Sequence, residues 1–246
     1  MPTMIGMART KAPGTAVEKL AGHLLDRERQ DPLTEELTMW LAGSARFRGF
    51  AEAHRAKIRK KLRTAADGEA LRDVRTELQV ARLLLLDKRI ELAFEAYGSG
   101  KLGPDLTVTF RGRRSFNLEV TRMRRMPDAT GLVASLLAKL RQLPPSSPNA
   151  VLVAIGGSTA EALDLVAATR ALRARADAKD QTFFTRRGFA GTREFYERYL
   201  RLSGVLVWCE GATGDARAPL WINRSARIPL PGPDVRAAVR SLRKDS

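Results

Sequence analysis

The spacing of apolar residues divides the chain into a helical first third and a mixed remainder. Between residues 15 and 62, large apolar residues recur at intervals of three and four, which is the period of amphipathic helices. Residues 1–14 carry prolines and glycine without an apolar period, so we expect a disordered arm there. The pattern therefore predicts an N-terminal helical region over residues 15–66 and a larger domain over residues 67–246.

The larger domain changes period soon after it begins. Residues 69–87 keep the helical spacing, whereas residues 89–97 alternate between apolar and polar, which is typical of a strand with one buried face. Two more strands are predicted at residues 105–110 and 115–122, each bounded by turn-forming residues. We expect these three strands to form an antiparallel meander.

A helix is predicted next, over residues 131–143, and a cluster of prolines ends it. The continuous apolar run at residues 150–155 is typical of a buried central strand. Later elements are a helix directly after this run, a helix at 192–202, strands at 204–210 and 219–223, and a short helix at 234–243. A meander followed by a helical crossover into a buried strand indicates an α/β fold with a mixed sheet covered by helices on both faces.

Composition and charge narrow the class of protein. Hydrophobic residues make up 44% of the chain and charged residues 28%, as in ordinary globular domains. The net charge of +16 favours a polyanionic partner, with nucleic acid ahead of an anionic membrane. A single cysteine, Cys209, and two histidines exclude a disulfide framework and a Cys/His zinc site. Because no apolar run reaches membrane-spanning length and no secretory signal opens the chain, we expect a cytoplasmic protein without a membrane partner, and a homodimer stays open.

Acidic side chains converge in the predicted meander. Asp105 opens the second strand directly after Pro104, Glu119 lies within the third strand, and Glu77 lies on the preceding helix. Carboxylate oxygens without His or Cys suit a hard cation such as Mg²⁺ or Mn²⁺, which promotes phosphodiester hydrolysis. The alternative is structural: Asp105 caps a turn, Glu119 pairs with Arg111 or Arg114 across the ladder, and Glu77 is a solvated helix acid.

These residues resemble a known family. The segments GPDLTV at 103–108 and NLEVT at 117–121, with Glu77 upstream, are similar to the PD-(D/E)xK nuclease superfamily. The resemblance covers about residues 71–155 and implies a restriction-endonuclease-like αβββαβ core. It implies a magnesium-dependent nuclease acting on DNA, in which Glu77, Asp105 and Glu119 bind the metal together with the backbone carbonyl of Val120.

One position departs from the family pattern, because Thr121 stands where the motif has lysine. We expect a substitute cation, either Lys139, which shares the following helix with Gln142, or Lys101 in the loop before Asp105; Lys139 is favoured. A second hypothesis is a catalytically inactive nuclease-fold module that binds nucleic acid. A third is a protein-interaction subunit.

Basic residues cluster near the proposed metal site and again in the first third of the chain. The helix predicted over residues 44–63 ends in a basic run. The run is consistent with contact to phosphate and with a solvated helix face, and both interpretations stay open. Around the site, fixed cations would hold a polyanion against the carboxylates. The candidate nucleic-acid contacts are Lys101, Arg111, Arg113, Arg114, Arg122, Arg124, Arg125, Gln142, Arg59 and Lys60.

Overall fold

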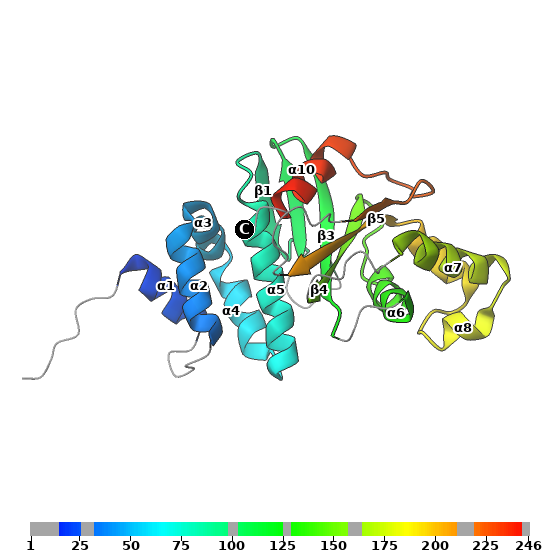
Figure 1. Ribbon diagram of the computed structural model, residues 1–246, viewed down its shortest axis with the longest axis horizontal. Helices are drawn as coiled ribbons and strands as arrows, with labels where there is room; N and C mark the ends of the chain where they lie inside the picture. Colours follow the sequence, from blue (N-terminus) through cyan, green and yellow to red (C-terminus); the bar gives the residue numbers. More distant parts are fainter. Residues whose placement is uncertain are drawn as a thin grey trace, which may run out of the picture. The chain divides into compact units, whose positions relative to one another are not determined.

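The computed structural model describes residues 15–25, 32–97, 103–124, 129–156, 164–210 and 219–242. The chain divides into two compact units, Met1–Arg63 and Thr64–Ser246 (Figure 1). The predicted disordered arm, Lys101 and Arg125 lie outside the described residues.

Helices make up the described part of the first unit. They are α1 (Ala16–Leu24), α2 (Pro32–Gly43), α3 (Ala45–Ala53) and α4 (Arg55–Thr64). The sequence predicted one helix over 44–63, which is wrong, because His54 leaves the helical range at φ −112° and separates α3 from α4. Its ring packs on Phe50 at a centroid distance of 5.0 Å, so the apolar spacing continues across the break.

The second unit is built on one mixed sheet. Its strands follow chain order, β1-β2-β3-β4-β5-β6, with β3, β4 and β5 parallel and the outer pairs antiparallel. The elements are α5 (Gly68–Leu84), β1 (Ile90–Phe94), β2 (Leu106–Phe110), β3 (Arg114–Arg122), α6 (Ala129–Leu140), β4 (Asn149–Gly156), α7 (Leu165–Asp177), α8 (Gln181–Thr185), α9 (Thr192–Tyr199), β5 (Leu202–Glu210), β6 (Leu220–Ile222) and α10 (Gly232–Leu242). The predictions of an α/β fold, a mixed sheet and an antiparallel meander are confirmed.

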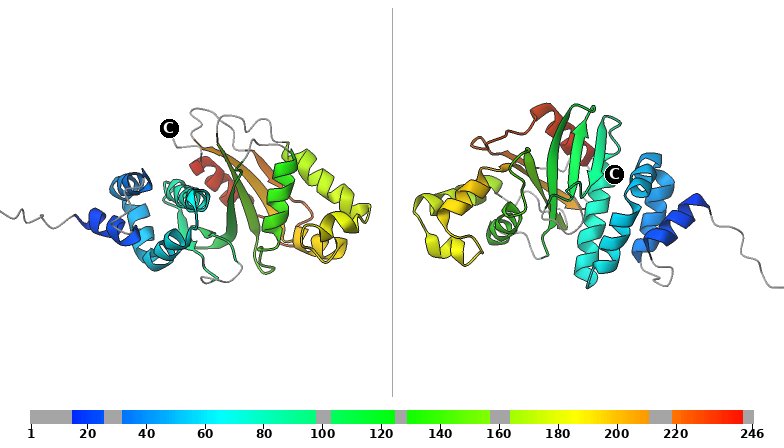
Figure 2. Two further views of the ribbon diagram at one scale, coloured as in Figure 1. Left: turned by 90° about the horizontal axis from the view of Figure 1, so that it is seen from below. Right: turned by 180° about the vertical axis from the view of Figure 1, so that it is seen from behind.

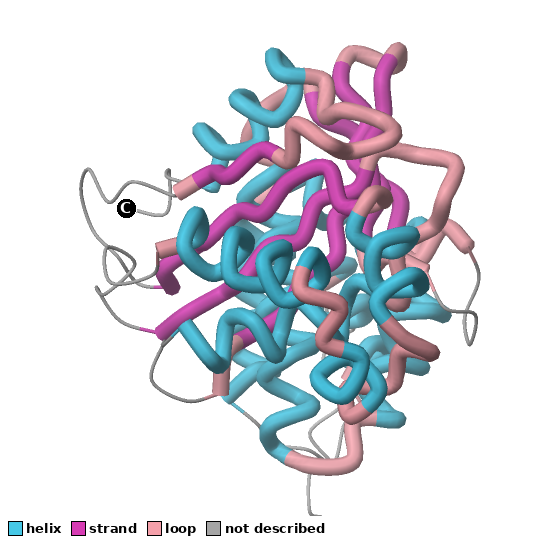
Figure 3. Tube along the Cα trace, turned by 90° about the vertical axis from the view of Figure 1, so that its right-hand side faces the viewer, coloured by secondary structure: helices cyan, strands magenta, loops and turns pink. Residues whose placement is uncertain are grey.

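Helices cover both faces of this sheet, as Figures 2 and 3 show. Alternate residues of β3 point to opposite faces. Arg122 binds acids of α5, whereas Glu119 binds Lys139 of α6. Therefore α5 and its neighbour α10 lie on one face, and α6 and its neighbour α7 lie on the other.

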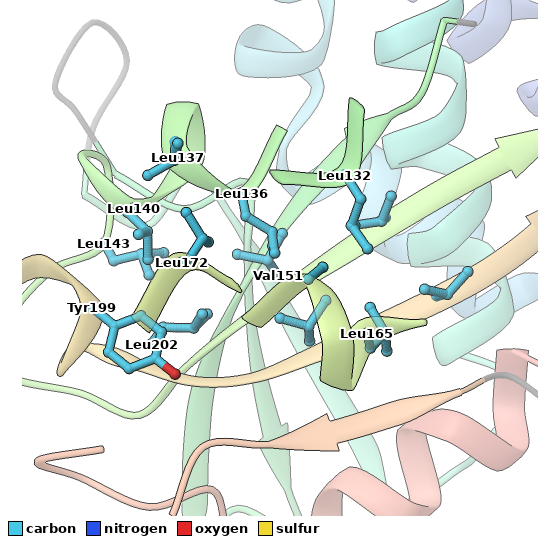
Figure 4. Close-up of a cluster of buried hydrophobic side chains, with 14 of the residues drawn as sticks. Leu132, Leu136, Leu137, Leu140, Leu143, Val151, Leu165, Leu172, Tyr199 and Leu202 are labelled. Carbon is cyan, nitrogen blue, oxygen red and sulfur yellow. The ribbon is translucent and has the colours of Figure 1, made fainter. Parts of the chain in front are cut away.

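The core on the α6 face contains a cluster of apolar side chains. Leucines of α6 and α7 meet the buried valines of β4 and β5 (Figure 4). Leu132, Leu136 and Leu140 recur at helical spacing on α6, so one stripe of that helix is buried while Lys139 lies beside it. Cys209 is buried in the same cluster, as a small apolar residue would be.

Some element boundaries differ from the predictions. The first strand ends at Phe94 and not at residue 97, because Glu95 adopts a left-handed conformation with φ 44°. The helix after β4 is described only from Leu165, where Asp164 caps it by accepting the N–H of Ala167 at 2.8 Å. Helix α8 was not predicted, because its five residues are too few to show a helical period.

Candidate functional site

Asp105 lies where β2 separates from β3. The antiparallel register ends at the pair Leu106 and Leu118, so the ladder stops short of Asp105. Beyond this pair, the two segments are joined by a side chain, because Oδ2 of Asp105 accepts a hydrogen bond from the Val120 N–H at 2.9 Å. The Asp105 carbonyl accepts the N–H of Glu95 at 2.9 Å. These bonds fix the buried Asp105 side chain beside the backbone of Glu119 and Val120.

Glu119 forms the central ion pair of the site. It is 1% exposed, and its Oε1 accepts a hydrogen bond from Nζ of Lys139 at 2.6 Å. The Lys139 side chain is 22% exposed, so the ammonium joins a buried carboxylate to the surface. Pairing of Glu119 with Arg111 or Arg114, the structural alternative, is wrong.

All three predicted acids affect the pKa of Lys139. Burial alone would lower the pKa of Lys139, but the carboxylates of Glu119, Asp105 and Glu77 and the hydrogen bond that Lys139 donates to Glu119 outweigh burial and raise the pKa above its ordinary value. Lys139 is therefore an ammonium at neutral pH. The three acids named by the sequence all lie within electrostatic reach of one cation.

Glu77 approaches from the other side of the sheet. It lies on α5 and is 6% exposed, so it is not the solvated helix acid of the structural alternative. Among the described residues, no group of three or more His, Cys, Asp or Glu side chains is arranged to hold a metal ion. Glu77 belongs to α5, whereas Lys139, the partner of Glu119, belongs to α6, and these two helices cover opposite faces of the sheet.

The remaining donors still suit a hard cation. The carboxylates of Asp105 and Glu119 and the carbonyl of Val120 offer oxygen donors, and the Asp105 carboxylate accepts a hydrogen bond from the Val120 N–H. Mg²⁺ commonly takes one or two carboxylates and leaves its other positions to water and phosphate. The donor chemistry therefore fits Mg²⁺ at Asp105 and Glu119, without requiring direct ligation by Glu77.

The lysine missing from β3 has a counterpart on α6. Thr121 lies on the same face of β3 as Glu119, since the two are alternate residues. Lys139 reaches that face from the last turn of α6. Gln142 follows the helix, and its N–H binds the carbonyl of Lys139 at 2.9 Å.

Two predicted phosphate contacts have another role. Arg122 binds Glu69 and Asp73 of α5, and its side chain is only 14% exposed. Arg124 binds Asp73 at 2.6 Å. This β3–α5 ion-pair cluster (Arg122, Arg124, Glu69 and Asp73) ties the end of β3 to the helix, so the structure gives Arg122 a structural role in place of phosphate contact.

The hairpin arginines, Arg111, Arg113 and Arg114, are exposed at the turn between β2 and β3. The sequence placed them around the metal site, which is wrong. Glu119 lies five residues beyond Arg114 on β3, and a rise of roughly 3.3 Å per residue gives a separation of about 17 Å. The first-unit candidates Arg59 and Lys60 lie on α4, half-buried and exposed respectively.

A buried amide network beside the site escaped sequence reasoning. Asn117 donates to Asn149 of β4 at 3.0 Å and to the Tyr97 hydroxyl at 3.3 Å. Asn149 donates to the carbonyls of Pro144, Ser147 and Arg201. The available signal was an asparagine at the start of each apolar strand segment, since a buried amide requires partners.

Tyr97 brings an aromatic ring to the approach to Asp105. Tyr97 is 38% exposed, and a methyl group at Gly103 would lie 2.8 Å from the Tyr97 Cβ. Glycine at 103 therefore permits the chain leading to Pro104 and Asp105 to pass against the tyrosine.

No helix in the described residues combines the length and the apolar character needed to cross a membrane. No protein-family model, curated protein or solved structure matches this chain.

Proposed function

We propose that this protein is a metal-dependent nuclease that hydrolyses phosphodiester bonds of DNA, with a restriction-endonuclease-like αβββαβ core. One observation carries the proposal. Where β2 separates from β3, Asp105 binds the backbone N–H next to Glu119, and Glu119 binds Lys139. The order α5, β1, β2, β3, α6, β4 supports the same core.

The proposed chemistry assigns a role to each side chain. Asp105 and Glu119 would hold Mg²⁺ or Mn²⁺, which polarises the phosphoryl group and lowers the pKa of the attacking water. Lys139, fixed by Glu119, presents positive charge to the phosphoryl oxygens as negative charge develops there. Because its pKa is raised, Lys139 acts as an electrostatic and orienting group and not as a general base. Glu77 adds negative charge that favours the ammonium form.

Cleavage assays test this proposal directly. Supercoiled, linear and single-stranded DNA are incubated with Mg²⁺ or Mn²⁺ and with the unaltered protein, Asp105→Asn, Glu119→Gln and Lys139→Met. We expect both acid variants to lose at least 100-fold in rate, and Lys139→Met to lose about 10- to 1,000-fold, as when one electrostatic donor is removed from an active site. Lys19→Met, which removes an exposed lysine of α1, is the matched control and should cleave normally.

A second function has its own supporting observation. The described residues hold no three-acid metal group, and the Glu119 carboxylate already binds Lys139, both of which favour an inactive nuclease-fold module that binds nucleic acid. Salt-dependent DNA binding by all five proteins, without cleavage of any substrate, would establish this module and refute the nuclease proposal.

A further inference from the structure

We propose that the hairpin arginines grip the sugar–phosphate backbone of the nucleic acid about five base pairs from the bond that is cleaved. The position of that bond rests on the proposed nuclease function, whereas the grip itself does not. The spacing follows from the separation of about 17 Å between Arg114 and Glu119 and from a duplex rise of about 3.4 Å per base pair.

The hairpin tip presents its cations to solvent. Arg111 and Gly112 both adopt positive φ, at 50° and 64°, and form the tight turn between the strands. Arg111, Arg113 and Arg114 are exposed, and in the described part of the chain no ion pair involves any of them. Three exposed arginines on one short turn, without acidic partners among the described residues, provide donors for phosphate oxygens.

An aromatic ring supports the tip from within the hairpin. The guanidinium of Arg111 lies over the Phe110 ring, 5.5 Å from its centroid, and that of Arg89 lies over the same ring at 5.1 Å. Stacking restricts the Arg111 side chain without using its hydrogen-bond donors on an acid. Arg89 is different, because it binds Asp87 at 2.6 Å.

Polar residues follow the tip along one face of the sheet. Thr109 and Ser115 are directly opposite each other, and Thr107 is opposite Asn117, one step closer to Glu119. These positions share one face with Glu119, whereas Arg114 and its partner Phe110 lie on the opposite face, so the arginines reach this face only from the tip. Thr109 is half-buried and Ser115 exposed, while Thr107 donates to the buried Asn117, so the first two offer hydroxyl groups to a ligand. Hydroxyl groups of this kind bind phosphate and sugar oxygens in protein–DNA complexes.

The charge along this face favours a path over β2 and β3. Glu91 of β1 is exposed on the same face, opposite Thr109, and would repel a phosphate at the sheet edge. Lys139 provides positive charge at the far end of the path. A single phosphate ester is too short to touch both ends, whereas a nucleic acid spans them.

The test compares two triple variants that lose the same charge. One carries Arg111→Gln, Arg113→Gln and Arg114→Gln; the matched control carries Arg170→Gln, Arg186→Gln and Arg193→Gln, which are exposed on or beside α7, α8 and α9. Binding of a fluorescent 30-base-pair duplex is measured by anisotropy in EDTA over a range of NaCl concentrations, after circular dichroism has shown that all proteins are folded.

We expect the hairpin variant to bind about 10- to 100-fold more weakly at 0.1 M NaCl and to lose about 3 from the slope of log K against log salt. The control should lose less than about threefold. Equal losses in both variants, or unchanged binding by the hairpin variant, would overturn the grip. Hairpin-dependent binding to vesicles of 20% phosphatidylserine without hairpin-dependent DNA binding would also overturn it, in favour of a membrane surface.

A length series in Mg²⁺ locates the grip relative to the cut. Duplexes that extend about eight base pairs beyond the cleavage position should be cut at least tenfold faster than those that extend three, and the hairpin variant should lose this difference. If the unaltered protein cleaves nothing while the hairpin variant binds weakly, the nuclease proposal fails and the grip stands. If cleavage depends on Asp105 while the hairpin variant binds and cleaves normally, the grip alone fails.

Discussion

The two ends of strand β3 carry the same residue type in opposite settings. At the C-terminal end, Arg122 and Arg124 belong to the β3–α5 ion-pair cluster and bind Glu69 and Asp73. At the N-terminal end, the hairpin arginines are exposed, and in the described residues they form no ion pair. The density of arginine is similar at both ends, so density alone does not predict function.

The neighbouring helix makes the difference. Glu69 and Asp73 are one turn apart on α5, which brings both carboxylates to the same stretch of β3. The hairpin tip projects beyond that stretch. Between the two ends, Glu119 and Lys139 form an ion pair that is more buried than either, so the strand passes from exposed cations through a buried pair to a structural cluster.

The largest expected effect is a loss of stability when the ion pair of Glu119 and Lys139 is broken. Lys139→Ala leaves the Glu119 carboxylate buried without its lysine, and we expect a loss of about 2 to 4 kcal/mol in the free energy of unfolding. Urea denaturation measures this loss. Lys19→Ala on α1 removes an exposed lysine and should change stability by less than about 0.5 kcal/mol.

A double variant separates lost charge from lost packing. Glu119→Gln with Lys139→Met removes both charges and roughly keeps the side-chain volumes, so it should recover more than half of the stability that Lys139→Ala loses. Failure to recover would mean that the lysine stem, and not its charge, stabilises α6 against β3.

The contrast between the ends of β3 predicts that a substitution at one end lowers stability alone, and that a substitution at the other end weakens DNA binding alone. Arg122→Ala should lower the melting temperature by about 2 to 4 °C and leave the affinity for duplex DNA unchanged, because its guanidinium binds protein acids. Arg114→Ala should weaken DNA binding about three- to tenfold and leave the melting temperature unchanged. Thermal melts and anisotropy on both variants decide the matter; weaker binding by Arg122→Ala in a folded protein would abolish the contrast.

Removing Glu69 and Asp73 should leave Arg122 and Arg124 without acidic partners, as the hairpin arginines are in the described residues. Glu69→Gln with Asp73→Asn releases Arg122 and Arg124, so we expect DNA binding to strengthen about two- to fivefold with a steeper salt slope. Glu194→Gln with Glu197→Gln, which removes two acids of α9, is the control for net charge alone. Equal strengthening in both double variants would show that net charge, and not the released arginines, controls affinity.

The sequence predicted what depends on local pattern. Alternation placed Glu119 within a strand, the Pro-Asp pair placed Asp105 at the start of its neighbour, and helical spacing put Lys139 beside the apolar stripe of α6. The meander and the mixed sheet followed from the change of period and the helical crossover, whereas the places of β5 and β6 in the sheet were not predicted.

The sequence did not reveal partners that are distant along the chain. Arg122 is 49 residues from Asp73, and Asn149 is 32 residues from Asn117, so no local pattern joins them. The end of β1 depends on one left-handed residue, Glu95, and the break before α4 on His54, and neither interrupts the apolar spacing. The sequence placed the hairpin arginines too close to Glu119, because residues that are near in the sequence of an extended strand are far apart in space.

The smallest expected effect is a pH dependence of the β3–α5 ion-pair cluster. The hydrogen bond from Arg122 lowers the pKa of Glu69 below 4.5, more than burial raises it. A carboxylate with a lowered pKa stabilises the folded state above its unfolded pKa and loses this contribution as the pH falls through the folded value. The melting temperature of the unaltered protein should therefore exceed that of Glu69→Gln at pH 6, and the difference should shrink below pH 4.5. In an Arg122→Ala background the same substitution should show a weaker pH dependence, because the group that lowers the pKa is gone; an equal dependence in both backgrounds would assign the effect to Arg72, which also binds Glu69.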